Sequence, residues 1–559
     1  MPCQVILPHG TILHLAKHIE LVETTLLFPA QKPAETIVPL SILDATVTHY
    51  APCAAVWFFD APVDKGAEPS PNWSNLQTSL RNTLSAFPHL AGELSIVNHD
   101  PTGDHTQRFG RLQVTYGAST DPGVEFSTAR CPLTLNDIVP TPARHQLPES
   151  KAWNLSCPVP TFFADALKLP FIIPGPQKRA PPVLIRVTEF ACGGITIGVL
   201  IAHCLADAQT LSVFMHRWSG EHALLSASSS VSASLPHTGL SDNVKQQEQQ
   251  EPLFNPQLLD HRAAGNINAP SPDESILARS RSLPSARYDW FYPAPDGNPD
   301  RRLPPGLTRE MVQSPGDPMP KGDWDHTLPK AHVKLYFSAE RIQRVWEDAQ
   351  VQSGKGVVSR HDAILAHVWG AINRARGLGA DKREVALHVI FGLRRRLGLP
   401  ETFLGSPILS ASVRMSGEDA SGSGSDVTSN YPVTGPVAAK IHDTLALYDS
   451  DAVKARLHDL CFECAPQRFW EGYLGPRHVI FSSWAHLDMY GVDFGGKEKA
   501  RHVEVCMPEQ DGMVSLIEGR PRAKKQGEKR HWCEDGIVIG VSLAADAVEK
   551  LKVDPALWS

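Results

Sequence analysis

The chain has no apolar run long enough to cross a membrane. Its longest, ITIGVLIA at residues 195–202, is far below the roughly 20 residues that a membrane-spanning helix needs. The N-terminal stretch MPCQVILPHGTILHLAKHIELVE lacks a basic start, an unbroken apolar segment and a small-residue cleavage site, so it does not have the pattern of a secretion signal. We therefore expect a cytoplasmic protein without a membrane span.

The chain also lacks a strong excess of one charge and a cysteine framework. A net charge of -7 over 559 residues, with no extended basic block, argues against nucleic acid or an anionic membrane as the main partner. Ten cysteines are scattered along the chain, unlike a disulfide framework. In CFEC, residues 461–464, buried helix cysteines are a better interpretation than a zinc site. We expect a small-molecule substrate, no metal and no permanently bound cofactor.

A length of 559 residues exceeds one ordinary core, and the composition changes along the chain. Strand-like and helical runs alternate at first, the next hundred residues are rich in Ser, Pro, Gly and Asp, and alternation then returns. The sequence thus predicts an α/β (α+β) protein. We expect an N-terminal domain at 1–219, a long, partly disordered crossover at 220–330 and a C-terminal domain at 331–559.

An HxxxD pattern occurs twice, as His203 to Asp207 in IAHCLADAQT and as His531 to Asp535 in HWCED. The first follows two strand-like runs that flank the turn sequence ACGG. After it, Leu211, Phe214, Met215 and Trp218 form one apolar helical face. His203 is therefore expected at the end of a core strand, with Asp207 near a helix N-terminus, where a carboxylate is electrostatically favoured.

The HxxxD pattern alone leaves two interpretations open. An aspartate at a helix start is often a cap, and a histidine leaving a strand is often bound only to a backbone carbonyl. A catalytic base needs a pocket that positions it. His531 follows the hydrophilic loop RAKKQGEKR and is expected in solvent, so the context favours His203. Cys204 is expected to point away from His203 if the strand geometry persists.

Three later segments contain further candidates. In SRHDAILAHVWGAINRAR, Ser359 and Asp362 form a capping-box pattern ahead of a buried helical stripe. In GLRRRLGLPETFLGSP, three adjacent arginines can pair with carboxylates at a domain seam or lie in solvent. In SSWAHLDMYGVDFGG, a glycine turn follows a strand-like run. The DFG there is not accompanied by the other kinase motifs, which argues against a kinase.

These segments, with NLQTSLRNTLSAFPHLAGEL at 75–94, resemble in order and approximate spacing the BAHD acyltransferases, and most nearly their fungal trichothecene acetyltransferase-like branch. The resemblance extends from about residue 70 to the C-terminus. It implies two chloramphenicol-acetyltransferase-like domains, each a mixed β-sheet with flanking helices, joined by a long crossover loop. It also implies an active site in a channel between them, and we expect a monomer.

The resemblance further implies roles for individual residues. His203 would remove the proton from an acceptor hydroxyl or amine as the acceptor attacks the carbonyl of an acyl-CoA. Asp207 would turn away and pair with Arg394, and Trp484 and Ser482 would donate to the oxyanion. Ser359 would contact the CoA. Structural roles near the channel would fall to Asp493, Gly495 and Gly496.

Departures from the family pattern limit this expectation. DFGGK replaces the usual Asp-Phe-Gly-Trp-Gly, Ala208 replaces a common glycine, and Ala202 stands where a peptide condensation domain has a second histidine. We expect a CoA-dependent acyltransferase that moves an acyl group, with acetyl-CoA as the expected donor, to a hydroxyl of a small specialised metabolite. The alternatives are an N-acyltransferase acting on a small amine and a catalytically silent binding protein of the same fold.

Overall fold

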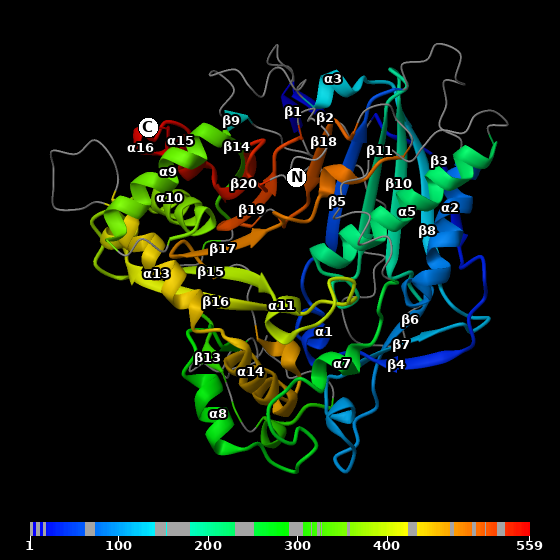
Figure 1. Cartoon of the computed structure of the whole chain (residues 1–559), viewed down its shortest axis with the longest axis horizontal. Helices are drawn as coiled ribbons and strands as arrows, with labels where there is room; N and C mark the ends of the chain where they lie inside the picture. The colour runs from blue at the N-terminus through cyan, green and yellow to red at the C-terminus, as the bar shows by residue number, and fades with distance from the viewer. Residues whose placement is uncertain are drawn as a thin grey trace.

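The computed structural model describes most of the chain. The described residues are 4–6, 12–14, 18–61, 73–139, 152–153, 179–229, 251–289, 306–312, 314, 316–320, 325, 327–354, 358–422, 433–469, 474–494, 499–508, 510–521 and 531–558. Two large mixed sheets lie side by side, each with helices on its outer face (Figure 1). The predicted α/β class with two sheet-containing halves is confirmed.

The first sheet contains six strands in the order β18-β5-β11-β10-β8-β3. Their bounds are Glu20–Leu27 (β3), Cys53–Phe59 (β5), Val124–Cys131 (β8), Val183–Phe190 (β10), Ile195–Ile201 (β11) and His502–Val505 (β18). The predicted turn between β10 and β11 is present, and Gly193 has a φ of 76°, a conformation that favours glycine. Helices α2 (Trp73–Ala86) and α5 (Ala208–Ser229) cover this sheet on the right of Figure 1.

The second sheet contains seven strands in the order β16-β15-β17-β19-β20-β14-β9. Their bounds are Ala152–Trp153 (β9), Lys330–Phe337 (β14), Glu384–Gly392 (β15), Ile408–Ser416 (β16), His478–Ser483 (β17), Met513–Glu518 (β19) and Ile537–Ala544 (β20). Its outer face packs on helices α9 (Ala339–Ser353), α10 (Arg360–Ala375), α13 (Gly435–Ala446) and α15 (Ala545–Lys552).

The two halves exchange edge strands. β18, from near the C-terminus, pairs antiparallel with β5 of the first sheet, while β9, from the N-terminal half, pairs with β14 of the second. The core of the first sheet includes Val503 and Val505 of β18, and also Trp484, which follows β17 of the second sheet. Each half therefore contributes one strand to the sheet of the other half.

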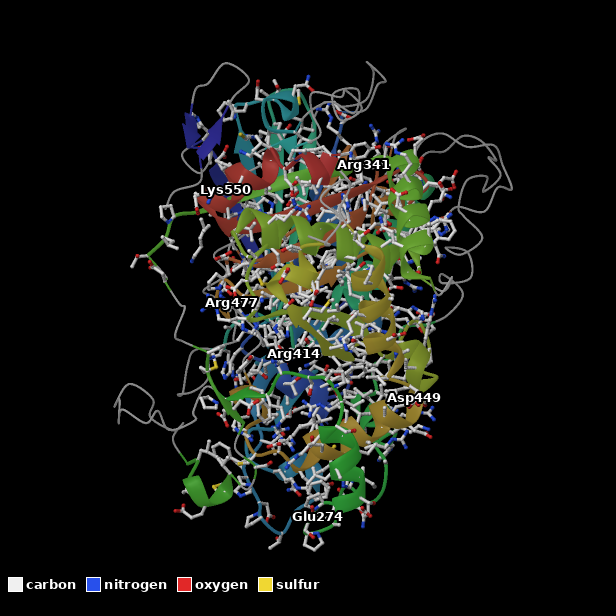
Figure 2. The ribbon with its side chains drawn as sticks, turned by 90° about the vertical axis from the view of Figure 1, so that its left-hand side faces the viewer. Glu274, Arg341, Arg414, Asp449, Arg477 and Lys550 are labelled. Atoms are coloured by element: carbon white, nitrogen blue, oxygen red, sulfur yellow. The ribbon has the colours of Figure 1, made fainter. Side chains whose placement is uncertain are left out.

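Smaller elements complete the molecule. They are β1 (Gln4–Ile6), β2 (Ile12–His14), β4 (Thr36–Pro39), α1 (Ile42–Thr46), β6 (Glu93–Ile96), β7 (Leu112–Tyr116), α3 (Leu135–Ile138), α7 (Pro256–Asp260), α8 (Glu274–Arg281), β12 (Tyr288–Asp289), β13 (Asp317–Pro318), α11 (Arg394–Leu397), α12 (Gly417–Ala420), α14 (Ser450–Phe462) and α16 (Pro555–Trp558). Figure 2 shows Lys550 of α15 and Arg341 of α9 near one end of the molecule and Glu274 of α8 at the other. Within the described ranges, no helix combines the length and apolar content needed to span a membrane.

The structure describes part of the segment predicted as a crossover. Residues 251–289 contain α7 and α8, and Leu259 of α7 packs in a common core with α1, α11 and α14. α5 continues to Ser229, past residue 219. The division into domains at 219 and 331 stays a prediction.

Candidate active site

His203 lies in the turn between β11 and α5, as the sequence predicts. The four residues Ala202, Cys204, Leu205 and Ala206 around it are buried, whereas its own side chain is only half-buried. The ring of Tyr50, which follows α1, stands edge-on to the imidazole with 5.7 Å between the ring centres. Cys204 lies in the core of the first sheet, and burial raises the pKa of its thiol well above the usual range. Cys204 is thus not an activated nucleophile.

The hydrogen bonds of Ser406 determine which imidazole nitrogen of His203 is free. The Ser406 hydroxyl donates a short bond to the backbone carbonyl of His203, and its oxygen lies 3.2 Å from His203 Nδ1. The single proton of the hydroxyl lies in the hydrogen bond to the carbonyl, so the Ser406 oxygen accepts a hydrogen bond from the Nδ1–H of His203. The lone pair is then on Nε2, which no described residue hydrogen-bonds. Burial lowers the pKa of His203 below its ordinary value, which favours this neutral form.

Asp44 holds Ser406 in place. The backbone N–H of Ser406 donates to Asp44 Oδ1 at 2.7 Å, and Asp44 closes the capping box of α1 by accepting from the hydroxyl and the N–H of Ser41. Gly405 has a φ of 120°, and an added Cβ would lie 2.9 Å from Asp44 Oδ1, so only glycine fits there. Burial raises the pKa of Asp44 to about 7.

Asp207 and Arg394 form a bidentate ion pair, with Nη1 to Oδ2 at 2.6 Å and Nη2 to Oδ1 at 2.9 Å. Both side chains are buried. Arg394 also donates to the carbonyl of Phe403, and Asp207 accepts from the N–H of Thr210 as the cap of α5. Asp207 therefore has both of the roles that the sequence suggests: it caps α5 and it pairs with Arg394. This ion pair connects the turn that contains His203 to the segment from Arg394 to Ser406.

Ser482 and Trp484 lie at the end of β17. Val479 and Phe481 point into the core of the second sheet, so Ser482 is on the opposite face, which looks toward the first sheet. Trp484 is 4% exposed and packs in the core of the first sheet. Neither the Ser482 hydroxyl nor the Trp484 indole N–H has a hydrogen-bond partner within the described residues, and neither contacts His203 by a hydrogen bond there.

The remaining predicted residues lie elsewhere. Ser359 is exposed and caps α10, and its predicted capping box with Asp362 is present. Asp493 is exposed, and the next residue, Phe494, packs edge-on against Trp218 of α5 at 4.9 Å. Gly495 and Gly496 lie outside the described residues. His531 is exposed, as expected from its loop.

A pocket opens beside Tyr50, between α1 and the inner face of the second sheet. It has about 500 Å³ of empty volume, part of it open to the outside. The enclosed part of it is small, about 40 Å³. Its lining consists of Thr46, Val47, Tyr50, Ala286, Ile390, Ile408, Leu409, Ser410, Arg456, Leu460 and Phe469.

The amino-acid sequence matches the model of a known family. The family model described as "Transferase family" matches residues 17–260 and 295–554 of the chain. The chain is a BAHD acyltransferase. This match confirms the family that the sequence motifs indicate, and with it the class of enzyme.

Two relatives resemble this acyltransferase in sequence, and one solved structure resembles it in fold. Acyltransferase AFT15-1 of Alternaria alternata is 31% identical, covering 90% of each chain. Acyltransferase abl6 of Leptosphaeria maculans is 28% identical, covering 94% of this chain and 95% of the relative. The crystal structure of TRI101 from F. sporotrichioides, in complex with coenzyme A and T-2, has a TM-score of 0.58 at 14% identity and covers 94% of this chain and 98% of that one. That likeness concerns the fold.

Sequence reasoning missed Asp44, Ser406 and Tyr50 in this acyltransferase. Asp44 had a local signal, because the sequence SILD at 41–44 is a capping-box pattern. Ser406 and Tyr50 had none, since each is adjacent to His203 only in the folded chain.

Proposed function

We propose that this acyltransferase transfers an acyl group from acyl-CoA, with acetyl-CoA as the expected donor, to a hydroxyl of a small specialised metabolite. The observation that carries the proposal is the half-buried His203, whose Nε2 has a free lone pair while Nδ1–H donates to Ser406. TRI101, which shares the fold, was crystallised with coenzyme A and T-2 bound together, and this supports the choice of donor.

In the proposed reaction His203 Nε2 takes the proton of the acceptor hydroxyl while the hydroxyl oxygen attacks the thioester carbonyl. The tetrahedral intermediate then collapses, the carbon–sulfur bond breaks, and the CoA thiolate leaves and receives the proton from the imidazolium. No covalent enzyme intermediate forms. Base catalysis of this kind is worth roughly 10²–10⁴-fold.

The oxyanion of the tetrahedral intermediate needs a hydrogen-bond donor. Ser482 and Trp484 are our proposed donors, because both are without a partner in the described residues and Ser482 faces the first sheet. Removing a single such donor typically lowers kcat by about 10²–10³-fold. Ser359, exposed at the N-terminus of α10, is our proposed contact for the donor.

Asp207 and Arg394 are proposed as positioning residues. The carboxylate and the guanidinium bind each other, backbone groups and the side chains of Thr210 and Gln209, so neither is available to substrate. Asp493, with Gly495 and Gly496, is proposed to shape the segment that packs Phe494 on α5.

The overall test is release of free thiol from acetyl-CoA by purified protein in the presence of an acceptor alcohol panel. We expect thiol release that depends on the alcohol and an ester product by mass spectrometry. The N-acyltransferase alternative predicts amide products with a matched amine panel and no ester. A catalytically silent protein would bind acetyl-CoA without releasing thiol in either panel.

The pH dependence of kcat/KM tests the state of His203. Because burial lowers its pKa, the neutral base persists below the ordinary histidine value, and we expect a plateau at neutral pH with a fall only below about pH 6.5. An acid limb above that pH that persists in Asp44→Asn would contradict the assignment. Asp44 titrates at about 7, so Asp44→Asn is the control that removes its contribution to the profile.

Ser406→Ala tests the proton position on His203. Without the hydroxyl, Nδ1–H and Nε2–H forms mix, and we expect kcat to fall about two- to tenfold, the value of one hydrogen bond. The matched control is Ser542→Ala, which removes a similar bond of 2.8 Å to Nδ1 of His332 on β14. An equal effect of the two substitutions would mean that Ser406 has only a structural role.

A further inference from the structure

His105 is a buried histidine outside the proposed reaction site, in the short helical turn η3 (His105–Gln107) before β7. Its backbone N–H and its Nδ1 both lie at the side-chain oxygen of Asn268, at 3.0 and 2.8 Å. A backbone N–H can only donate, so this oxygen accepts and Nδ1 also carries a proton. Nε2 lies 3.2 Å from the carboxylate of Asp260, which accepts as well. Both ring nitrogens therefore donate, and His105 is an imidazolium.

The charge on His105 is matched by Asp260 of α7, which is also buried. Burial alone opposes a charge on the ring, but the hydrogen bond to Asp260 and its negative charge outweigh burial, and the pKa of His105 is raised. Asp104 adds a weaker attraction from the same turn. Arg111, whose Nε donates to the backbone carbonyl of His105, also attracts Asp260. The imidazolium and Asp260 thus form the hydrogen-bonded ion pair of this buried cluster.

Asp260 connects His105 to α1, which lies beside α7 in Figure 1. Its two carboxylate oxygens lie 3.0 and 3.3 Å from the N–H of Ile42, the first residue of α1. In the same helical turn, Asp44 accepts from the backbone N–H of Ser406 at 2.7 Å. Two carboxylates therefore hold the start of α1, with Asp260 on the side of His105 and Asp44 on the side of Ser406.

We propose that His105 is a positioning residue for the acyl-transfer site. As an imidazolium it holds Asp260, the two carboxylates fix the start of α1, and Asp44 holds Ser406 against His203. The role of His203 as the base rests on the proposed function.

A neutral imidazole at His105 would disturb this arrangement in two ways. One ring nitrogen would present a lone pair to the oxygen of Asn268 or of Asp260, and the buried Asp260 would lose its hydrogen-bonded cation. The change would also reach Asp44 electrostatically. Burial raises the pKa of Asp44 most, and the negative charge of Asp260 raises it further.

The first experiment measures the pH dependence of stability and does not depend on catalysis. A raised histidine pKa contributes stability that is fully present below the ordinary value of about 6.5 and is lost as pH rises through the folded-state pKa. Urea midpoints of the full-length protein are measured at about pH 6 and about pH 9. We expect the midpoint to fall less in His105→Gln, which keeps a donor for Asp260 but has no charge, than in the wild type.

His99→Gln is the matched control for this experiment. His99 is exposed, and its Nδ1 lies 3.2 Å from the backbone carbonyl of Gln107. Its midpoint should fall as much as that of the wild type. Asp44, with a pKa of about 7, titrates in all three proteins, so the comparison isolates His105. Equal falls in the wild type and in His105→Gln would overturn the charge on His105.

The second experiment tests whether His105 acts through Ser406. His105→Gln, Ser406→Ala and the double variant are compared in the thiol-release assay at neutral pH. We expect His105→Gln to lower kcat about two- to tenfold, no more than Ser406→Ala does. The double variant should lose no more than Ser406→Ala alone, because both substitutions remove the same orientation of His203. His99→Gln should leave kcat unchanged.

Multiplying losses in the double variant would overturn the positioning role of His105 and leave it a structural one. The urea experiment needs no thiol release. A failure of the proposed transferase reaction is therefore distinguishable from a failure of the imidazolium at His105.

Discussion

His203→Ala is expected to lower kcat/KM for acyl transfer by about two to four orders of magnitude. The substitution removes the Nε2 lone pair that accepts the acceptor's proton. It leaves the bond between the Ser406 hydroxyl and the His203 carbonyl, which belongs to the backbone, so the turn should keep its shape. The measurement is the initial rate of thiol release at limiting acceptor, with circular dichroism to verify folding.

His531→Ala is the matched control for His203→Ala. It changes the histidine of the other HxxxD pattern, which is exposed and whose Nδ1 lies near Cys533 rather than a pocket. We expect wild-type kinetics. If His203→Ala retained the wild-type rate, or if both substitutions reduced it equally, the catalytic role of His203 would be wrong.

Arg394→Met is expected to produce the largest loss of stability. It leaves the carboxylate of Asp207 buried without its cation, which typically costs about 3–5 kcal/mol in the free energy of unfolding. Because the pair ties the His203 turn to the Ser406 segment, kcat should fall as well. Urea denaturation measures the first effect and the thiol assay the second.

Two further variants separate the ion pair from general damage. Asp207→Asn combined with Arg394→Met removes both charges, so part of the lost stability should return. Arg395→Met changes the adjacent arginine, whose side chain is 87% exposed and pairs with Glu401, and should cost less than about 1 kcal/mol. The double variant could instead be less stable than Arg394→Met, by the full further loss in free energy of unfolding expected for an independent substitution. That result would contradict the pairing of Asp207 with Arg394.

Several features of the fold could be predicted because their causes are local. The apolar stripe of Leu211, Phe214, Met215 and Trp218 follows the helical period, and all four residues are buried in α5. The Ser359 capping box needs only residues three positions apart. The Asp207–Arg394 pair is different, since it joins residues 187 positions apart and was expected only through the family resemblance.

The two α/β halves, the strand end that carries His203 and the helix that Asp207 caps could all be predicted from the sequence, as could the family of the enzyme. These depend on short-range periodicity, on turn residues and on motifs read in order. Folding brings Ser406 and Asp44 to His203, where they select the imidazole nitrogen that is free. It also places β9 and β18 in the opposite sheets, and it brings Ser410 and Arg456 into one pocket with Tyr50. The reason is physical: strand register and packing bring together groups hundreds of residues apart, and no local pattern in the chain encodes those distances.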